Sequence, residues 1–91
     1  MKLMEVTRRL HQLDANATIY ATRPWRTDSA AHIREEPEDR LVPEDLEKDG
    51  YEYFLEVFVA KEVVPNLSHV EPSFTLEQWC ERLISYAEND A

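Results

Sequence analysis

The two ends of the chain each carry hydrophobic residues that recur every three or four positions. Near the N-terminus the repeat consists of Leu3, Val6, Leu10 and Leu13. Near the C-terminus a longer repeat consists of Leu76, Trp79, Cys80, Leu83, Ile84 and Ala87. This period is typical of an α-helix that buries one face. We therefore predict two terminal helices that pack on a common core.

The C-terminal helix also has a clear start signal. Thr75 can cap the helix, and Gln78, three residues later, completes a capping box. Phe74 and Trp79 occupy the two positions of a hydrophobic staple. We expect the helix to fray near residues 88–90, because acidic side chains there meet the negative end of the helix dipole.

Two segments between these helices have the composition of β-strands. Residues 17–23 are rich in β-branched and aromatic side chains and predict a short strand. Residues 51–63 alternate with a period of two and predict a long strand with two distinct faces. The predicted core face is the odd-numbered one, which carries Tyr51, Tyr53, Leu55, Val57, Val59 and Val63. The even-numbered face mixes carboxylates with phenyl rings, and it either packs beneath another element or meets a partner.

The segment between these strands admits more than one structure. Residues 30–35 fit either a short second strand or a helical turn capped by Asp28 or Ser29. A short helix further on is better determined. Pro43 suits its first position, and Gly50, the only glycine, suits a left-handed residue just after its end. We expect this helix to lead directly into the long strand.

These elements predict a single α+β domain over residues 1–91. We expect a small two-layer sandwich in which the terminal helices pack on a small, mainly antiparallel sheet. A chain of this length can bury a core without crosslinks, and its single cysteine excludes an internal disulfide. No apolar segment is long enough for a signal peptide or a membrane span. The expected protein is soluble and cytoplasmic and does not interact with membranes.

Charge is distributed unevenly along the chain. Residues 1–34 have a net charge of +3, residues 35–52 have nine acidic and two basic side chains and a net charge of −7, and residues 53–91 have a net charge of −5. This field disfavours direct binding to nucleic acid, which requires clustered Lys and Arg. It fits either a basic protein partner or the general effect of net charge on solubility.

No pattern in the chain predicts a catalytic, cofactor or metal site. His69 and Glu71 form the one close pair of histidine and carboxylate, but a metal site usually needs three or four ligands. Cys80 lies within the apolar repeat of the last helix, where we expect it to pack as a small hydrophobic residue. One glycine cannot form a Gly-rich phosphate loop. We therefore expect a protein that is not an enzyme and holds no cofactor.

Trp25 is the aromatic residue most suggestive of an interface. It lies between Arg23 and Arg26, and both Trp and Arg are enriched at the centres of interfaces. Its alternative role is a lid over the edge of the core. Trp25, the acidic segment and the even-numbered strand face together give the predicted partner-binding residues, which are Trp25, Glu35, Glu36, Glu38, Asp39, Glu52, Phe54, Glu56 and Phe58.

Three segments, LDANATIYATRPW, GYEYFLEVFVAKEV and RLISYAENDA, together resemble small bacterial proteins that include immunity proteins of polymorphic toxins. The resemblance implies a small α+β binding domain that neutralises a toxin, and it implies no catalytic residues. The alternative function is a structural homodimer or an accessory subunit. In that case Phe54 and Phe58 are buried against a second copy or another chain, and the acidic residues form a rim.

Overall fold

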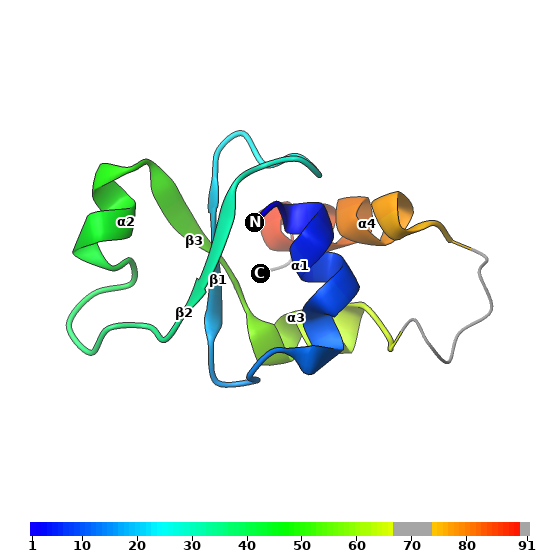
Figure 1. Ribbon diagram of the computed structural model, residues 1–91, viewed down its shortest axis with the longest axis horizontal. Helices are drawn as coiled ribbons and strands as arrows, with labels where there is room; N and C mark the ends of the chain where they lie inside the picture. The colour runs from blue at the N-terminus through cyan, green and yellow to red at the C-terminus, as the bar shows by residue number, and fades with distance from the viewer. Residues whose placement is uncertain (67–73, 90–91) are drawn as a thin grey trace.

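A three-stranded antiparallel sheet forms the centre of the protein in the computed structural model (Figure 1). The structure describes residues 1–66 and 74–89. The central strand is β1 (Thr18–Thr22), with β2 (Ala31–Arg34) on one side and β3 (Tyr51–Glu56) on the other. The strand predicted over residues 17–23 is confirmed as β1. The segment at residues 30–35, which fitted either a strand or a helical turn, contains the strand β2.

Helices lie on both faces of this sheet (Figure 1). One face is covered by α1 (Leu3–Arg9), which continues as the 3-10 helix η1 (Leu10–Gln12), and by α3 (Val57–Val63) and α4 (Leu76–Asn89). The other face is partly covered by α2 (Glu44–Lys48), whose N-cap is Pro43. The prediction of a small α+β fold, with terminal helices on an antiparallel sheet, is confirmed. Pro43 precedes α2, so the helix starts one residue later than predicted.

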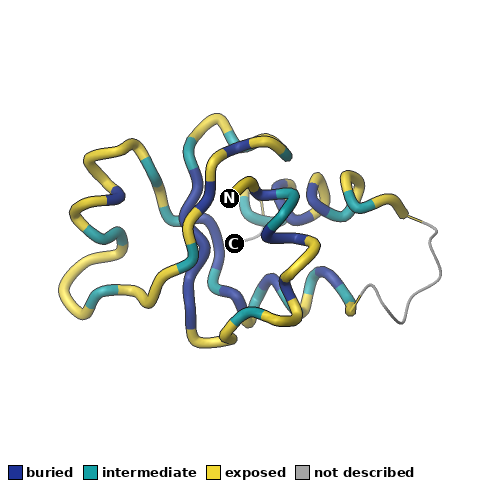
Figure 2. Tube along the Cα trace, in the orientation of Figure 1, coloured by how far each residue is buried: buried dark blue, intermediate teal, exposed yellow. Residues whose placement is uncertain are grey.

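The main core lies between the sheet and helices α1, α3 and α4 (Figure 2). Its most buried residues include Leu3, Val6, Leu10, Ile19, Ala21, Phe54, Leu55, Val57, Ala60, Cys80 and Leu83. Full burial of a large aliphatic or aromatic side chain contributes about 1.5–3 kcal/mol. This layer therefore provides most of the hydrophobic stabilisation, and it contains the predicted apolar faces of both terminal helices.

A smaller apolar cluster lies on the opposite face, where α2 packs against the sheet. Tyr20 and Leu46 are buried there, and the ring of Tyr20 meets the ring of Tyr53 edge-to-face with centroids 6.4 Å apart. The Tyr20 hydroxyl donates a hydrogen bond to the carbonyl oxygen of Leu41 at 2.9 Å. This bond satisfies the polar end of a buried ring and ties the loop before α2 to the sheet.

The ends of α4 and α2 show the predicted local signals. The Thr75 N–H donates to Gln78 Oε1 at 2.8 Å, and the Gln78 N–H donates to the Thr75 hydroxyl at 3.1 Å, which confirms the capping box. The rings of Phe74 and Trp79 form the staple with centroids 4.9 Å apart. Gly50 follows α2 with a φ of 85°, a left-handed conformation that glycine adopts without steric cost.

The prediction of one long strand over residues 51–63 is wrong, since β3 ends at Glu56 and α3 follows. The reason is the length of its partner strand. β1 begins at Thr18, which pairs with Glu56, and the Val57 N–H then donates to the carbonyl oxygen of Ala17 at 3.0 Å. The ladder has no further partner among the described residues. A helix satisfies the following backbone groups within the segment itself.

The sequence of α3 fits a helix as well as a strand. Val57, Ala60 and Val64 are buried at spacings of three and four, so they form one helical face toward the core. Lys61 Nζ donates to the carbonyl oxygen of the residue after η1 at 2.7 Å. At the end of α3, His11 Nε2 is hydrogen-bonded to the carbonyl oxygen of Val64 at 2.6 Å. These contacts hold α3 against η1.

A bulge in β3 also changes the predicted core face. β1 pairs first with Tyr53 and then with Leu55, so Phe54 is the extra residue. Phe54 and Leu55 therefore both face the main core, and Glu56 returns to the face of Tyr53. The predicted odd-numbered core face is wrong for Tyr51 and Tyr53, which are half-buried on the α2 side.

Phe54→Ala and Phe58→Ala form a matched pair that tests the bulge. Phe54 is 1% exposed, whereas Phe58, four residues later, is 48% exposed. We expect Phe54→Ala to lower the free energy of unfolding by about 3–5 kcal/mol, because it leaves a cavity in the core. Phe58→Ala should change it by only about 0.5 kcal/mol. Urea denaturation followed by circular dichroism measures both values.

Equal losses for the two variants would contradict the bulge. If Phe54→Ala does not fold, Phe54→Leu and Phe58→Leu replace the pair. The same order of stability is expected for them, with a smaller difference.

Candidate protein-binding site at one end of the sheet

Strand pairing brings distant parts of the chain together where β1 begins. Thr18, the first residue of β1, pairs with Arg34 at the end of β2 and with Glu56 at the end of β3. Antiparallel neighbours end where the central strand begins. The residues that follow β2 and β3 therefore converge with the turn before β1, at the lower end of the sheet in Figure 1.

A depression with a volume of about 400 Å³ lies at this end, and we call it the sheet-end depression. It is lined by Glu35 and Glu36, which follow β2, by Glu56 and Phe58 at the junction of β3 and α3, and by residues 15–18. None of these lining residues is basic. Three carboxylates and an exposed ring, each predicted from the sequence as a binding residue, thus share one concave surface.

Tyr53 holds Glu56 in place at the sheet-end depression. The Tyr53 hydroxyl donates a hydrogen bond to Glu56 Oε1 at 3.2 Å. Burial raises the pKa of Tyr53 to about 12, and the charge and hydrogen bond of Glu56 act in the same direction. Tyr53 therefore stays neutral around pH 7 and remains a donor that orients the Glu56 carboxylate.

Glu36 acts on the same pair of tyrosines. Burial, followed by the negative charge of Glu36, raises the pKa of Tyr20. The charge of Glu36 also contributes to the raised pKa of Tyr53. Two carboxylates of the sheet-end depression therefore lie close enough to the tyrosines to oppose their ionisation.

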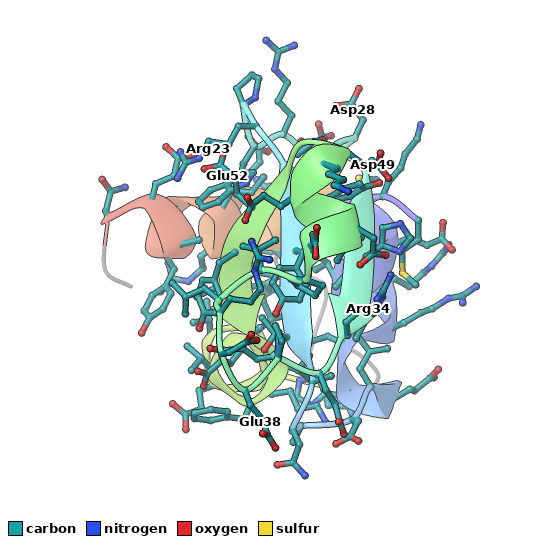
Figure 3. All side chains as sticks on the ribbon, turned by 90° about the vertical axis from the view of Figure 1, so that its left-hand side faces the viewer. Arg23, Asp28, Arg34, Glu38, Asp49 and Glu52 are labelled. Atoms are coloured by element: carbon teal, nitrogen blue, oxygen red, sulfur yellow. The ribbon has the colours of Figure 1, made fainter. Side chains whose placement is uncertain are left out.

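Basic residues on the α2 side are engaged with other acidic residues. The ion pairs there are Arg34–Asp45, Arg40–Glu44, Arg40–Glu47 and Lys48–Glu44. By contrast, no ion pair within the described residues involves the four exposed carboxylates that follow β2. We call these four the unpaired acidic segment, and they are Glu35, Glu36, Glu38 and Asp39. Glu38 lies at the lower end of the molecule in Figure 3, toward the sheet-end depression, whereas Arg23 and Glu52 lie at the upper end.

Trp25 lies toward that upper end and covers the edge of the core. Its ring packs edge-to-face on Phe54 with centroids 4.8 Å apart, and its Nε1 donates to the carbonyl oxygen of Ala21 at 3.4 Å. The Arg23 guanidinium lies 4.0 Å from the centre of the Trp25 ring and is paired with Glu52 at 3.1 Å. These contacts support the lid role for Trp25. Neither Trp25 nor Glu52 lines the sheet-end depression.

Phe54 is not available to a partner, so its prediction as a binding residue is wrong. It is buried in the main core, because the bulge turns it toward the helices. The even-numbered residues of the predicted strand therefore separate into three environments. Phe54 is core, Glu52 is ion-paired with an arginine, and Glu56 and Phe58 line the sheet-end depression.

The other chemical groups singled out in the sequence do not join this site. Cys80 is fully buried, and burial raises the pKa of its thiol, which keeps the thiol protonated and unreactive. His69 and Glu71 lie outside the described residues. Within residues 1–66 and 74–89, no group of three or more His, Cys, Asp or Glu is placed to hold a metal ion. No helix in this part of the chain is long and apolar enough to cross a membrane.

Two contributors to the site were missed by the sequence patterns. Tyr53 was assigned to the core face, and only the bulge places its hydroxyl beside Glu56. Residues 15–17, which precede β1, and Thr18 at its start carry no binding signal in the sequence, because their place in the site depends on the register between β1 and its neighbours.

Comparison of the chain with protein-family models, with curated proteins and with solved structures finds no match in any of the three. No binding residue or partner therefore comes from similarity.

The raised pKa of Tyr53 predicts how stability changes in alkali. The folded state holds the Tyr53 proton more tightly than the unfolded state, whose pKa is near 10.0. The resulting stabilisation is fully present below the unfolded pKa and is lost as the pH rises to the folded value of about 12. We expect the free energy of unfolding to fall over this interval, and Tyr53→Phe to reduce the fall. Denaturant titrations across the interval measure it.

A second variant isolates the contribution of the carboxylate. Glu56→Gln removes the negative charge beside the hydroxyl and should lower the pKa of Tyr53, measured by tyrosinate absorbance. An unchanged alkaline titration in Glu56→Gln would contradict the contact between the two side chains.

Proposed function

We propose that this chain is a non-enzymatic protein-binding module that engages a basic partner through the end of the sheet where β1 begins. The observation that carries the proposal is the unpaired acidic segment. Its four carboxylates form no ion pair with a described residue, although Arg34, Arg40 and Lys48 on the same side of the sheet are paired with other acidic residues. The carboxylates of α2 are therefore largely paired, whereas the four acidic side chains of the segment after β2 are left without a basic partner among the described residues.

An uncompensated cluster of like charges destabilises the folded chain slightly through self-repulsion. A basic partner relieves this repulsion, and the complementary potential speeds the encounter and excludes partners of the wrong charge. Phe58 supplies the apolar surface that an interface buries at its centre, because its exposed ring is surrounded by polar groups and loses its water on binding. The combination suits a protein surface better than a polyanion such as nucleic acid.

In the more specific version of this proposal, the partner is a toxin and the chain is its immunity or inhibitor protein. This form rests on the resemblance of the three sequence segments to immunity proteins. It requires a basic surface on the toxin. The acidic end of the sheet would cover that surface and block access to it. Copurification of the chain with an enzyme that it inhibits would support this form.

A structural homodimer is the competing proposal, and the exposed ring of Phe58 favours it. In a dimer with two-fold symmetry the same patch of each copy meets the other. The carboxylates around Phe58 would then lie near their own counterparts, and like charges at close range are destabilising. A basic partner avoids this repulsion, so we favour it over a second copy and over a generic accessory role.

Reversing the unpaired acidic segment tests the proposal. A variant with Lys at Glu35, Glu36, Glu38 and Asp39 changes the charge of these four positions from −4 to +4. We expect the immobilised variant to retain at least about tenfold less partner from a lysate of the source organism, equivalent to roughly 1.4 kcal/mol. Quantitative mass spectrometry of the retained proteins measures this loss.

The matched control places Lys at four exposed acidic residues of α3 and α4, which are Glu62, Glu77, Glu81 and Glu88. It changes the net charge equally and should retain the partner. Retention of the same protein by the first variant, or equal loss from both, would contradict the proposal. Sedimentation of the wild-type chain, run alongside, should give a monomer. A dimer that Phe58→Glu dissociates would favour the competing proposal.

A further inference from the structure

The chain already contains one arginine held between an aromatic ring and a carboxylate. The Arg23 guanidinium lies 4.0 Å from the centre of the Trp25 ring, and its Nε lies 3.1 Å from Glu52 Oε2. The ring and the carboxylate together accommodate a charged group that is roughly half exposed. This arrangement uses both properties of a guanidinium, which stacks on rings through its flat face and bonds carboxylates through its edge.

The sheet-end depression presents the same two kinds of group without a cation. Phe58 offers a ring that is 48% exposed, and Glu35, Glu36 and Glu56 offer carboxylates around it. No Lys, Arg or His lines the depression. Its volume of about 400 Å³ lies near the lower end of the range of roughly 300–1,000 Å³ typical of ligand pockets. This size suits one long side chain with its neighbouring backbone.

One of these carboxylates is already oriented. Tyr53 donates to Glu56 Oε1 at 3.2 Å, while Glu56 Oε2 makes no hydrogen bond within the described residues. Fixing the acceptor in advance reduces the entropy that binding must remove. Glu56 thus offers one free oxygen on a carboxylate that is held by the sheet.

We infer that the sheet-end depression takes an arginine side chain of the basic partner, with its guanidinium on the ring of Phe58 and paired with Glu56. This inference rests on the proposed function and names the group that the partner inserts. Lysine fits less well, because its ammonium is a strongly hydrated point charge without a flat face. The negative charge of the depression favours a cation, and its exposed ring favours the planar guanidinium over the ammonium of lysine.

Two peptides of equal charge, hexa-arginine and hexa-lysine, test the inference. Each is added to the ¹⁵N-labelled chain, and amide shifts give the affinity and the place of binding. We expect hexa-arginine to bind roughly threefold or more tightly, as cation–π contacts at exposed sites allow. The largest shifts should fall on residues 15–18, 35–36 and 56–58.

Phe58→Leu keeps an apolar side chain but removes the ring. Because Phe58 is exposed, this variant should fold like the wild-type chain, and its affinities for the two peptides should become equal. The control variant with Lys at Glu77 and Glu81, both on α4, should leave the preference for arginine unchanged.

The outcomes separate the inference from the proposed function. Equal binding of both peptides at the sheet-end depression would overturn the arginine assignment and leave the basic partner in place. A preference for arginine that survives in Phe58→Leu would overturn the assignment to the ring. Shifts confined to α4, or no binding of either peptide, would also overturn the inference. The lysate experiment with the four-residue reversal then decides the proposed function independently.

Discussion

Phe54, the extra residue of the β3 bulge, packs edge-to-face on Trp25 with ring centroids 4.8 Å apart. Because the bulge admits one additional residue, two consecutive side chains enter the main core and Glu56 moves to the opposite face of the sheet. The strand then reaches the end of its partner, α3 begins, and Phe58 is left outside the core. Trp25 covers Phe54 from the loop after β1. The bulge thus decides which side chains of β3 enter the core, and the start of β1 decides where β3 gives way to α3.

The second constraint is the distribution of charged side chains around the sheet and its helices. Ion pairs at exposed positions contribute little to stability individually, but here they decide which carboxylates remain uncompensated. Arg34 pairs with Asp45 and Arg40 with Glu47 on the α2 side, and the residues immediately after β2 have no such partner among the described residues. The sheet concentrates these acidic residues, because the end of β2 and the end of β3 lie on either side of the start of β1. Geometry, more than composition, turns a run of acidic residues into a surface with an exposed ring.

Local patterns predicted much of the fold, since the signals lie within a few residues of one another. The capping box of α4, the strand β1 and the glycine after α2 all depend on neighbours in the chain. The secondary structure after Glu56 was mispredicted, because the valine-rich residues there satisfy both a period of two and the helical spacing of Val57, Ala60 and Val64. The choice between strand and helix there depends on the length of β1, which is a tertiary constraint. For the same reason Glu35, Glu36, Glu56 and Phe58 could be named individually as binding residues, whereas their meeting in one depression and the burial of Phe54 required the register of the sheet.

The central claim is that the bulge buries Phe54 and leaves Phe58 at the surface of the sheet-end depression. The chain has three phenylalanines, so ¹⁹F NMR of protein labelled with 4-fluorophenylalanine gives one signal for each ring. A soluble paramagnetic agent should broaden the signals of Phe58 and Phe74, which are 48% and 41% exposed, and leave that of Phe54 sharp. A broadened Phe54 signal, or a Phe58 signal as protected as that of a core residue, would contradict the account.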